Sequence, residues 1–187
     1  MKFTETRLSG SYVIEFDKLV DERGFFARSF DSKKFKNVNL NQKIVHCNVS
    51  FSYKKGTIRG MHYQISPYEE SKLIRCTKGK VLDVIIDLRE NSNSKFESFS
   101  VELDSSKHNM LYVPEGFAHG FQTLEDNSEV FYQNSEIHMP EFERGVRFDD
   151  PFFNIEWPIN EKIVSEKDRS WPLVSNDEIK GTGNEIK

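Results

Sequence analysis

The stretch GTIRGMHYQ, residues 56–64, contains a histidine that could act as a base or as a metal ligand. The imidazole of His62 titrates near neutral pH, which suits it to proton transfer. A metal site on a strand needs a second ligand two residues later, because alternate strand residues face the same side. That position is Gln64, a poor ligand for zinc or iron. The spacing therefore favours a proton-transfer site with no metal and no cofactor.

A second histidine, His119, follows the turn that begins with Pro114 and Gly116. Metal-binding barrels often place a late ligand after such a PxG turn, following an earlier His-x-His pair. Here the earlier pair is incomplete, because Gln64 occupies its second position. A metal-dependent barrel, such as an oxygenase or a sugar isomerase, stays open as an alternative and predicts activity that chelators abolish.

The composition is that of a globular chain of single-domain length. The chain has 187 residues, of which 36% are hydrophobic and 30% charged, with a net charge of −4. This balance lacks the basic footprint of a nucleic-acid binder. Cys47 and Cys76 form no CxxC pair, and the N-terminal MKFTETRLSG has no apolar leader. We expect a cytoplasmic protein without nucleic-acid or membrane partners, with one domain over residues 1–187 and a frayed tail from about residue 175.

Short β-like segments must position these side chains. Runs rich in β-branched or aromatic residues, bounded by turn residues, cover 12–16, 43–52, 72–77, 80–88, 96–103, 109–114, 119–124 and 128–135. In the run 80–88, alternation predicts a half-buried strand with Asp83 and Asp87 on one face. Helical patterns are short, near residue 31 and near residue 165. The sequence predicts an all-β, cupin-type jelly-roll barrel or sandwich with short peripheral helices.

Seven motifs, in order, closely resemble the dTDP-4-dehydrorhamnose 3,5-epimerase family of deoxysugar enzymes. They are DERGFF (21–26), GTIRGMHYQ (56–64), KLIRCTKGKVLDVIIDLRENS (72–92), YVPEGFAHGFQTL (112–124), VFYQN (130–134), ERGVRFDDPFFNIEWP (143–158) and SEKD (165–168). The resemblance implies a metal-free, dimeric jelly-roll barrel. It also implies inversion of carbons beside the C4 ketone of a nucleotide-linked 4-keto-6-deoxyhexose, in deoxysugar supply for a surface polysaccharide such as an O-antigen.

Such a reaction needs a base, a stabiliser for the enolate oxygen and an acid on the opposite face of the sugar. The resemblance implies that His62 is the base, paired with Asp168, that Lys72 stabilises the enolate and that Tyr132 donates the proton. The further substrate-binding positions that it implies are Arg23, Phe26, Asn48, Arg59 and His119. Among them, Arg23 and Arg59 are expected to grip diphosphate oxygens, because a guanidinium fork fits that geometry.

Each of these residues also has an ordinary structural interpretation. A single histidine on a strand is often structural, arginines often form surface ion pairs, and Asp168 could be a solvated charge in a helical turn. A non-catalytic barrel that binds a sugar nucleotide is therefore a further alternative. It predicts that His62→Ala leaves function intact.

Three positions depart from the family pattern. Arg28 replaces a usual glutamate, His46 replaces a usual glutamine, and His138 replaces a usual aromatic residue, commonly tyrosine. In the family these positions lie near the nucleobase. Thymine presents an N–H donor at N3 that a carboxylate accepts, whereas cytosine presents an acceptor that an arginine satisfies. The exchange leads to the hypothesis of a CDP-linked substrate, and inversion at C3, at C5 or at both stays open.

Overall fold

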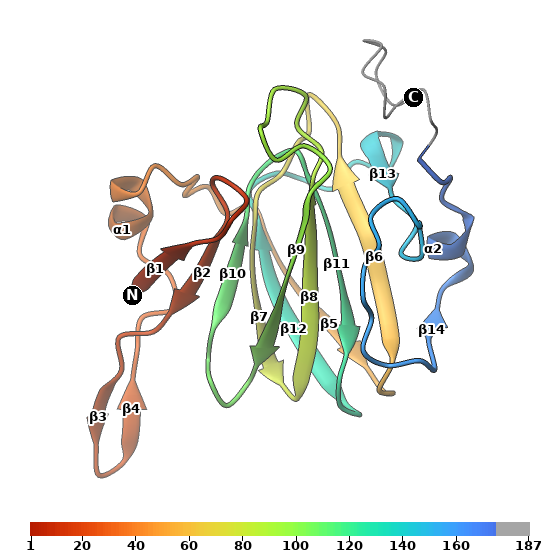
Figure 1. The fold of residues 1–187 in the computed structure, drawn as a ribbon. Helices are drawn as coiled ribbons and strands as arrows, with labels where there is room; N and C mark the ends of the chain where they lie inside the picture. The colour runs from red at the N-terminus through yellow and green to blue at the C-terminus, as the bar shows by residue number, and fades with distance from the viewer. Residues whose placement is uncertain (175–187) are drawn as a thin grey trace.

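The computed structural model describes residues 1–174 and is built almost entirely from strands (Figure 1). One sheet contains β1 (Lys2–Glu5), β2 (Tyr12–Glu15), β5 (His46–Ser52), β7 (Lys72–Lys78), β10 (Met110–Val113) and β12 (Ser128–Asn134). The other contains β6 (Thr57–Gln64), β8 (Lys80–Asp87), β9 (Ser98–Asp104), β11 (Phe117–Thr123), β13 (Glu143–Gly145) and β14 (Ile163–Val164). The expected frayed tail from about residue 175 lies outside the described residues.

The two sheets have the crossed-over strand orders of a jelly roll. The first runs β1-β2-β10-β7-β12-β5, and the second runs β13-β6-β11-β8-β9, with β14 added in parallel along β6. Consecutive strands such as β5 and β6 therefore lie in different sheets. The predicted all-β fold with short peripheral helices is confirmed.

The main core lies between the two sheets. Ile74 and Leu111 of the first sheet pack there against Val81, Ile85 and other apolar side chains of the second. The sheets thus hold residues from distant parts of the chain at fixed positions across a common interior.

The prediction that residues 80–88 form a half-buried strand is wrong, because β8 is buried on both faces. Val84 and Ile86 lie beneath a second apolar cluster that includes Phe148 and Trp157. The segment that carries these two aromatic residues covers the outer face of the second sheet. Because these covering residues are distant in sequence, the alternation within residues 80–88 does not reveal that the outer face of the strand is buried.

A small hairpin formed by β3 (Leu19–Asp21) and β4 (Gly24–Phe26) projects away from the two sheets (Figure 1). Its six strand residues are all exposed. Nearby, α1 (Ser32–Asn37) begins after Asp31, whose carboxylate accepts hydrogen bonds from two backbone amides. This helix docks through the buried ring of Phe35.

Two further short helical segments follow the last long strand. The 3-10 helix η1 (Pro140–Phe142) leads into β13, and α2 (Glu166–Ser170) begins after Ser165, whose hydroxyl accepts from the Asp168 amide. The helices predicted near residues 31 and 165 are therefore both confirmed. None of the helices within residues 1–174 is long and apolar enough to cross a membrane.

Close contact between β6 and β11 depends on a glycine. Gly60 has φ +112°, and an added Cβ would lie 2.6 Å from the carbonyl oxygen of His119 and 2.7 Å from Cα of Gly120. Only glycine combines this backbone conformation with so close an approach. The register between β6 and β11 also shifts beside this point, between His119 and Phe121.

Candidate active site

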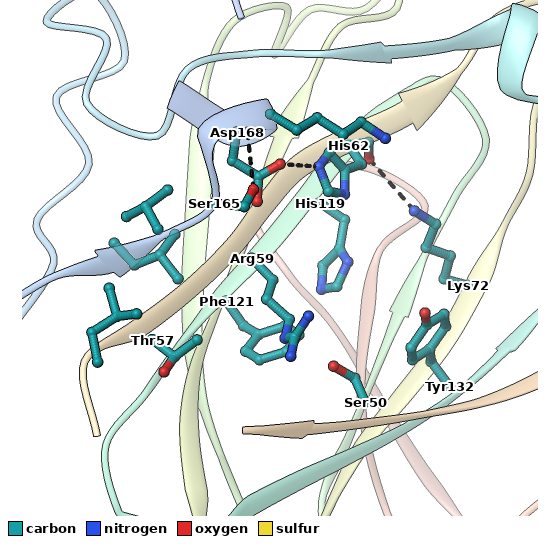
Figure 2. A pocket seen from close by; sticks show the side chains of 14 residues that line it. Ser50, Thr57, Arg59, His62, Lys72, His119, Phe121, Tyr132, Ser165 and Asp168 are labelled. Atoms are coloured by element: carbon teal, nitrogen blue, oxygen red, sulfur yellow. Dashed lines mark hydrogen bonds and ion pairs between the residues drawn. The ribbon is translucent and has the colours of Figure 1, made fainter. Parts of the chain in front are cut away.

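The β6 strand presents His62 to a carboxylate carried by α2. His62 Nε2 lies 2.6 Å from Oδ1 of Asp168 (Figure 2). The aspartate side chain is only 5% exposed, whereas the histidine side chain is 32% exposed and faces a cavity. The interpretation of Asp168 as a solvated charge is therefore wrong.

The charge of this carboxylate is set by its neighbours. Burial raises the pKa of Asp168, whereas the hydrogen bond and the charge of His62 lower it. Hydrogen bonds with the Gly60 amide and with Ser165 lower it further. The net effect is a pKa below the usual range for an aspartate. Asp168 is thus ionised at neutral pH. An ionised partner orients the imidazole ring and stabilises its protonated form.

The cavity beside His62 has a volume of about 510 Å³ and is lined from both sheets. Tyr132 of β12 and Lys72 of β7 reach it from the first sheet, opposite the His62–Asp168 pair (Figure 2). Burial, and next the negative charge of Glu70, raise the pKa of Tyr132, and the nearby positive charge of Arg59 opposes them. Tyr132 is therefore a neutral phenol at physiological pH, able to donate a proton.

Lys72 is held on two sides. Its ammonium lies 3.1 Å from a carboxylate oxygen of Glu70, and both side chains are 9% exposed. Nζ also lies 3.5 Å from the backbone carbonyl oxygen of His62. A buried, charged donor is thus fixed next to the imidazole.

A second histidine–carboxylate pair lies deeper in the same cavity. His119 of β11 places Nε2 2.9 and 3.0 Å from the two carboxylate oxygens of Asp83 on β8. Burial raises the pKa of Asp83, and the charges of His119 and Lys72 oppose that rise. The pair therefore fixes the orientation of the His119 ring at the cavity wall.

An adjoining cavity of about 310 Å³ shares His62, Lys72 and Tyr132 with the first. It gathers three predicted positions, His46, Asn48 and His138. The three shared residues thus line both cavities.

The walls of this second cavity are tied together by polar contacts. His138 lies 3.1 Å from a carboxylate oxygen of Glu143, whose other oxygen is 2.7 Å from the ammonium of Lys167. The Gln64 amide donates to the backbone carbonyls of Tyr68 and Ile137 and accepts from the Met139 amide. Gln64 therefore holds the loop after β12. Among residues 1–174, no group of three or more His, Cys, Asp or Glu side chains is arranged to hold a metal ion.

The remaining predicted substrate-binding residues divide between two regions. Arg59 lines the larger of the two cavities (Figure 2). Its guanidinium also donates to the backbone carbonyl of Phe51. Arg23, Phe26 and Arg28 lie in the β3–β4 region, outside both cavities. Arg23 pairs with Asp21, Arg28 pairs with Asp31, and the Phe26 ring is exposed. Within one chain, the structure brings together nine of the twelve predicted site residues and leaves these three apart.

Known proteins resemble this chain in both sequence and fold. A model of the family described as dTDP-4-dehydrorhamnose 3,5-epimerase matches residues 5–176.

The chain belongs to the dTDP-4-dehydrorhamnose 3,5-epimerase family.

Individual members of the family are similar over almost their whole length. The dTDP-4-dehydrorhamnose 3,5-epimerase of Methanothermobacter thermautotrophicus is 38% identical over 179 residues, which cover 94% of this chain and 96% of the relative. The crystal structure of the Elizabethkingia anophelis enzyme has a TM-score of 0.90 at 38% identity, covering 92% of this chain and 96% of that one. The Legionella pneumophila epimerase, solved with dTDP-4-keto-L-rhamnose, has a TM-score of 0.86 at 33% identity and covers 92% of each chain. This family member is an isomerase, an epimerase of sugar nucleotides.

Three acidic residues of this epimerase site were not anticipated as site residues. Asp83 was recognised only as part of a strand face, although a carboxylate inside an otherwise apolar run is itself a sign of a buried partner. Glu70 lies two residues before Lys72, a spacing that places side chains on one face when the backbone is extended. Glu143 carries no local signal, because its partners are distant in sequence.

Proposed function

We propose that this epimerase inverts C3 and C5 of a dTDP-linked 4-keto-6-deoxyhexose, with His62 as base and Tyr132 as acid. The observation that carries the proposal is that the His62–Asp168 pair and the neutral phenol of Tyr132 line one cavity from opposite sheets. Inversion requires a base and an acid on opposite faces of the sugar.

The first step removes the hydrogen on a carbon next to the C4 ketone. His62 takes this proton, the C–H electron pair forms the enolate, and the negative charge develops on the ketone oxygen. Asp168 stabilises the imidazolium, and the ammonium of Lys72 stabilises the enolate oxygen. His119, whose Nε2 is held by Asp83, lines the same cavity.

The second step returns a proton from the other face. Tyr132 donates its phenolic proton to the same carbon while the enolate collapses to the ketone, so the configuration is inverted. Proton exchange with solvent restores His62 and Tyr132. Rotation of the sugar in the cavity then allows the second α carbon to react. The names of the family relatives give epimerisation at both positions, 3 and 5, for those proteins.

We further propose that the enzyme acts as a homodimer. Arg23 and Phe26 lie on a projecting hairpin and Arg28 follows it, all outside the two cavities described for their own chain. Leu19 and Val20 of the same hairpin are 68% and 75% exposed. A second copy of the chain would bury this apolar surface and could bring the arginines to the nucleotide. The oligomeric state in solution, with and without residues 19–26 replaced by a short glycine linker, tests the dimer.

The proposed preference for a nucleobase depends on Arg28, which follows the β3–β4 hairpin. In this chain its guanidinium pairs with Asp31, which leaves the thymine preference of the family as the simplest proposal. Turnover of dTDP- and CDP-4-keto-6-deoxyglucose, compared side by side, tests it. A clear preference for the CDP sugar would overturn the dTDP proposal and support base reading by Arg28.

The central experiment follows the sugar by proton NMR in D2O. We expect deuterium to enter at C3 and C5 and the inverted product to accumulate, with activity retained in a chelator and lost in His62→Ala. Exchange at C3 alone would overturn double inversion. Activity lost to the chelator would support a metal-dependent barrel, and binding of the sugar nucleotide without exchange would support a non-catalytic one.

A further inference from the structure

A buried carboxylate outside the predicted catalytic set is tied to two parts of the cavity. One oxygen of Glu70 lies 3.1 Å from the ammonium of Lys72, and the other accepts a hydrogen bond from the Asn134 amide at 2.6 Å. The amide oxygen of Asn134 accepts in turn from Asn48 at 3.1 Å. These contacts form a chain from the start of β7 across β12 to β5.

We propose that Glu70 is a positioning residue of the active site: its carboxylate fixes the ammonium of Lys72 and, through Asn134, the wall that carries Asn48. The proposal rests on the proposed function for the roles of Lys72 and Tyr132. It adds a residue that touches neither the reacting carbon nor the ketone oxygen.

The first argument concerns the donors of Lys72. A lysine ammonium has three N–H donors on a flexible stem. Glu70 accepts at one side, and the carbonyl oxygen of His62 lies at a second. The remaining donor is directed to the cavity, which Lys72 lines. A fixed acceptor behind the ammonium therefore aims one donor at the ligand.

The second argument concerns which carboxylate can hold the ammonium of Lys72 in place. Asp83 also attracts Lys72, but both of its oxygens lie at hydrogen-bond distance from the His119 ring. Among residues 1–174, Glu70 is the carboxylate that forms an ion pair with Lys72. Loss of its charge would leave a buried ammonium without a counter-ion, which is costly.

A third argument comes from Tyr132. After burial, the charge of Glu70 is the next largest influence that raises the pKa of Tyr132. A negative charge near a phenol favours the protonated form, which is the form that a proton donor needs. Removal of this charge must therefore lower the pKa of Tyr132.

The test uses Glu70→Gln, which keeps the size and the carbonyl acceptor for Asn134 and removes the charge. Tyrosine labelled with 13C at Cζ reports phenol titration in the full chain, and Tyr132→Phe assigns the signal. We expect Tyr132 to lose its proton at a lower pH in Glu70→Gln. The alkaline limb of the kcat profile should shift in the same direction, with kcat reduced roughly 10- to 100-fold by misplacement of the donor.

Two further variants complete the test. Glu69→Gln removes the charge of the adjacent, exposed glutamate and should leave both the titration and kcat unchanged. Glu70→Asp retains the charge and should restore the Tyr132 titration. If Glu70→Gln unfolds at a lower temperature, all variants are compared below its unfolding transition. An unchanged titration together with unchanged kcat in folded Glu70→Gln overturns the proposal. Absence of turnover in the wild type would overturn the proposed function instead, because the titration needs no substrate.

Discussion

His62 and Asp168 are separated by 106 positions in the sequence, yet Nε2 and Oδ1 lie 2.6 Å apart because α2 packs against β6. Replacement of Asp168 by asparagine keeps the shape of the side chain but removes the charge that stabilises an imidazolium. We expect kcat to fall roughly 100-fold or more, with a much smaller change in KM. Steady-state kinetics measure this. Asp149→Asn, at an exposed aspartate, is the matched control, and equal kcat in the two variants would contradict the pairing.

Tyr132→Phe separates proton removal from inversion. In this variant the proposed base His62 remains, but the phenol proposed to return a proton from the opposite face is gone. We expect deuterium to enter the substrate with its configuration retained, while the inverted product forms at least roughly 100 times more slowly. Proton NMR in D2O records both. Inverted product at the wild-type rate would exclude Tyr132 as the acid.

Gly145→Ala tests the packing that holds α2. A Cβ on this residue would lie 2.2 Å from Cε2 of Trp171, whose ring centroid is 6.4 Å from that of His62. We expect a loss of about 1 to 3 kcal/mol in unfolding free energy from overpacking, together with reduced kcat. Chemical denaturation and kinetics measure the two effects.

A smaller side chain at Trp171 should relieve the same clash. In a Trp171→Leu background the added methyl of Gly145→Ala has more room, so its cost should shrink, as expected for residues in direct contact. If the effects of the two substitutions on unfolding free energy were strictly additive, direct contact between residue 145 and the Trp171 ring would be contradicted.

Asp104 gives a prediction for acid stability. Hydrogen bonds from the hydroxyl and amide of Ser106, and the charge of Lys80, lower the pKa of Asp104 to about 2. A lowered folded-state pKa contributes stability above the unfolded value of about 3.9, and this contribution is lost as the pH falls through the folded value. The difference in urea midpoint between wild type and Asp104→Asn should be full at pH 7 and shrink from about pH 4 to pH 2. A difference unchanged at pH 2 would contradict it.

Much of the fold was predictable because its strands carry local signals. The alternating run of β8, the turns between strands and the cap at Asp31 are all readable from neighbouring residues. The family motifs also identified His62, Tyr132 and Lys72, which line the cavity. Their chemistry depends on residue type and order, which a sequence records directly.

Other features depend on contacts between distant segments. Burial of the outer face of β8 comes from a segment near Phe148 and Trp157, which no local pattern around β8 announces. The carboxylate of Glu143 meets Lys167 and His138 only after the sheets have formed. The position of Arg28, just after the β3–β4 hairpin, follows from the path of the chain outside the two main sheets. Such features require the three-dimensional structure.

The position of α2 in the sequence also determines when the His62–Asp168 pair can form. Within residues 1–174, every strand of both sheets precedes Asp168 in the chain, so Asp168 is synthesised after the strand that carries His62 and after the rest of both sheets. The His62–Asp168 pair therefore forms only after α2 has been synthesised and has packed against β6.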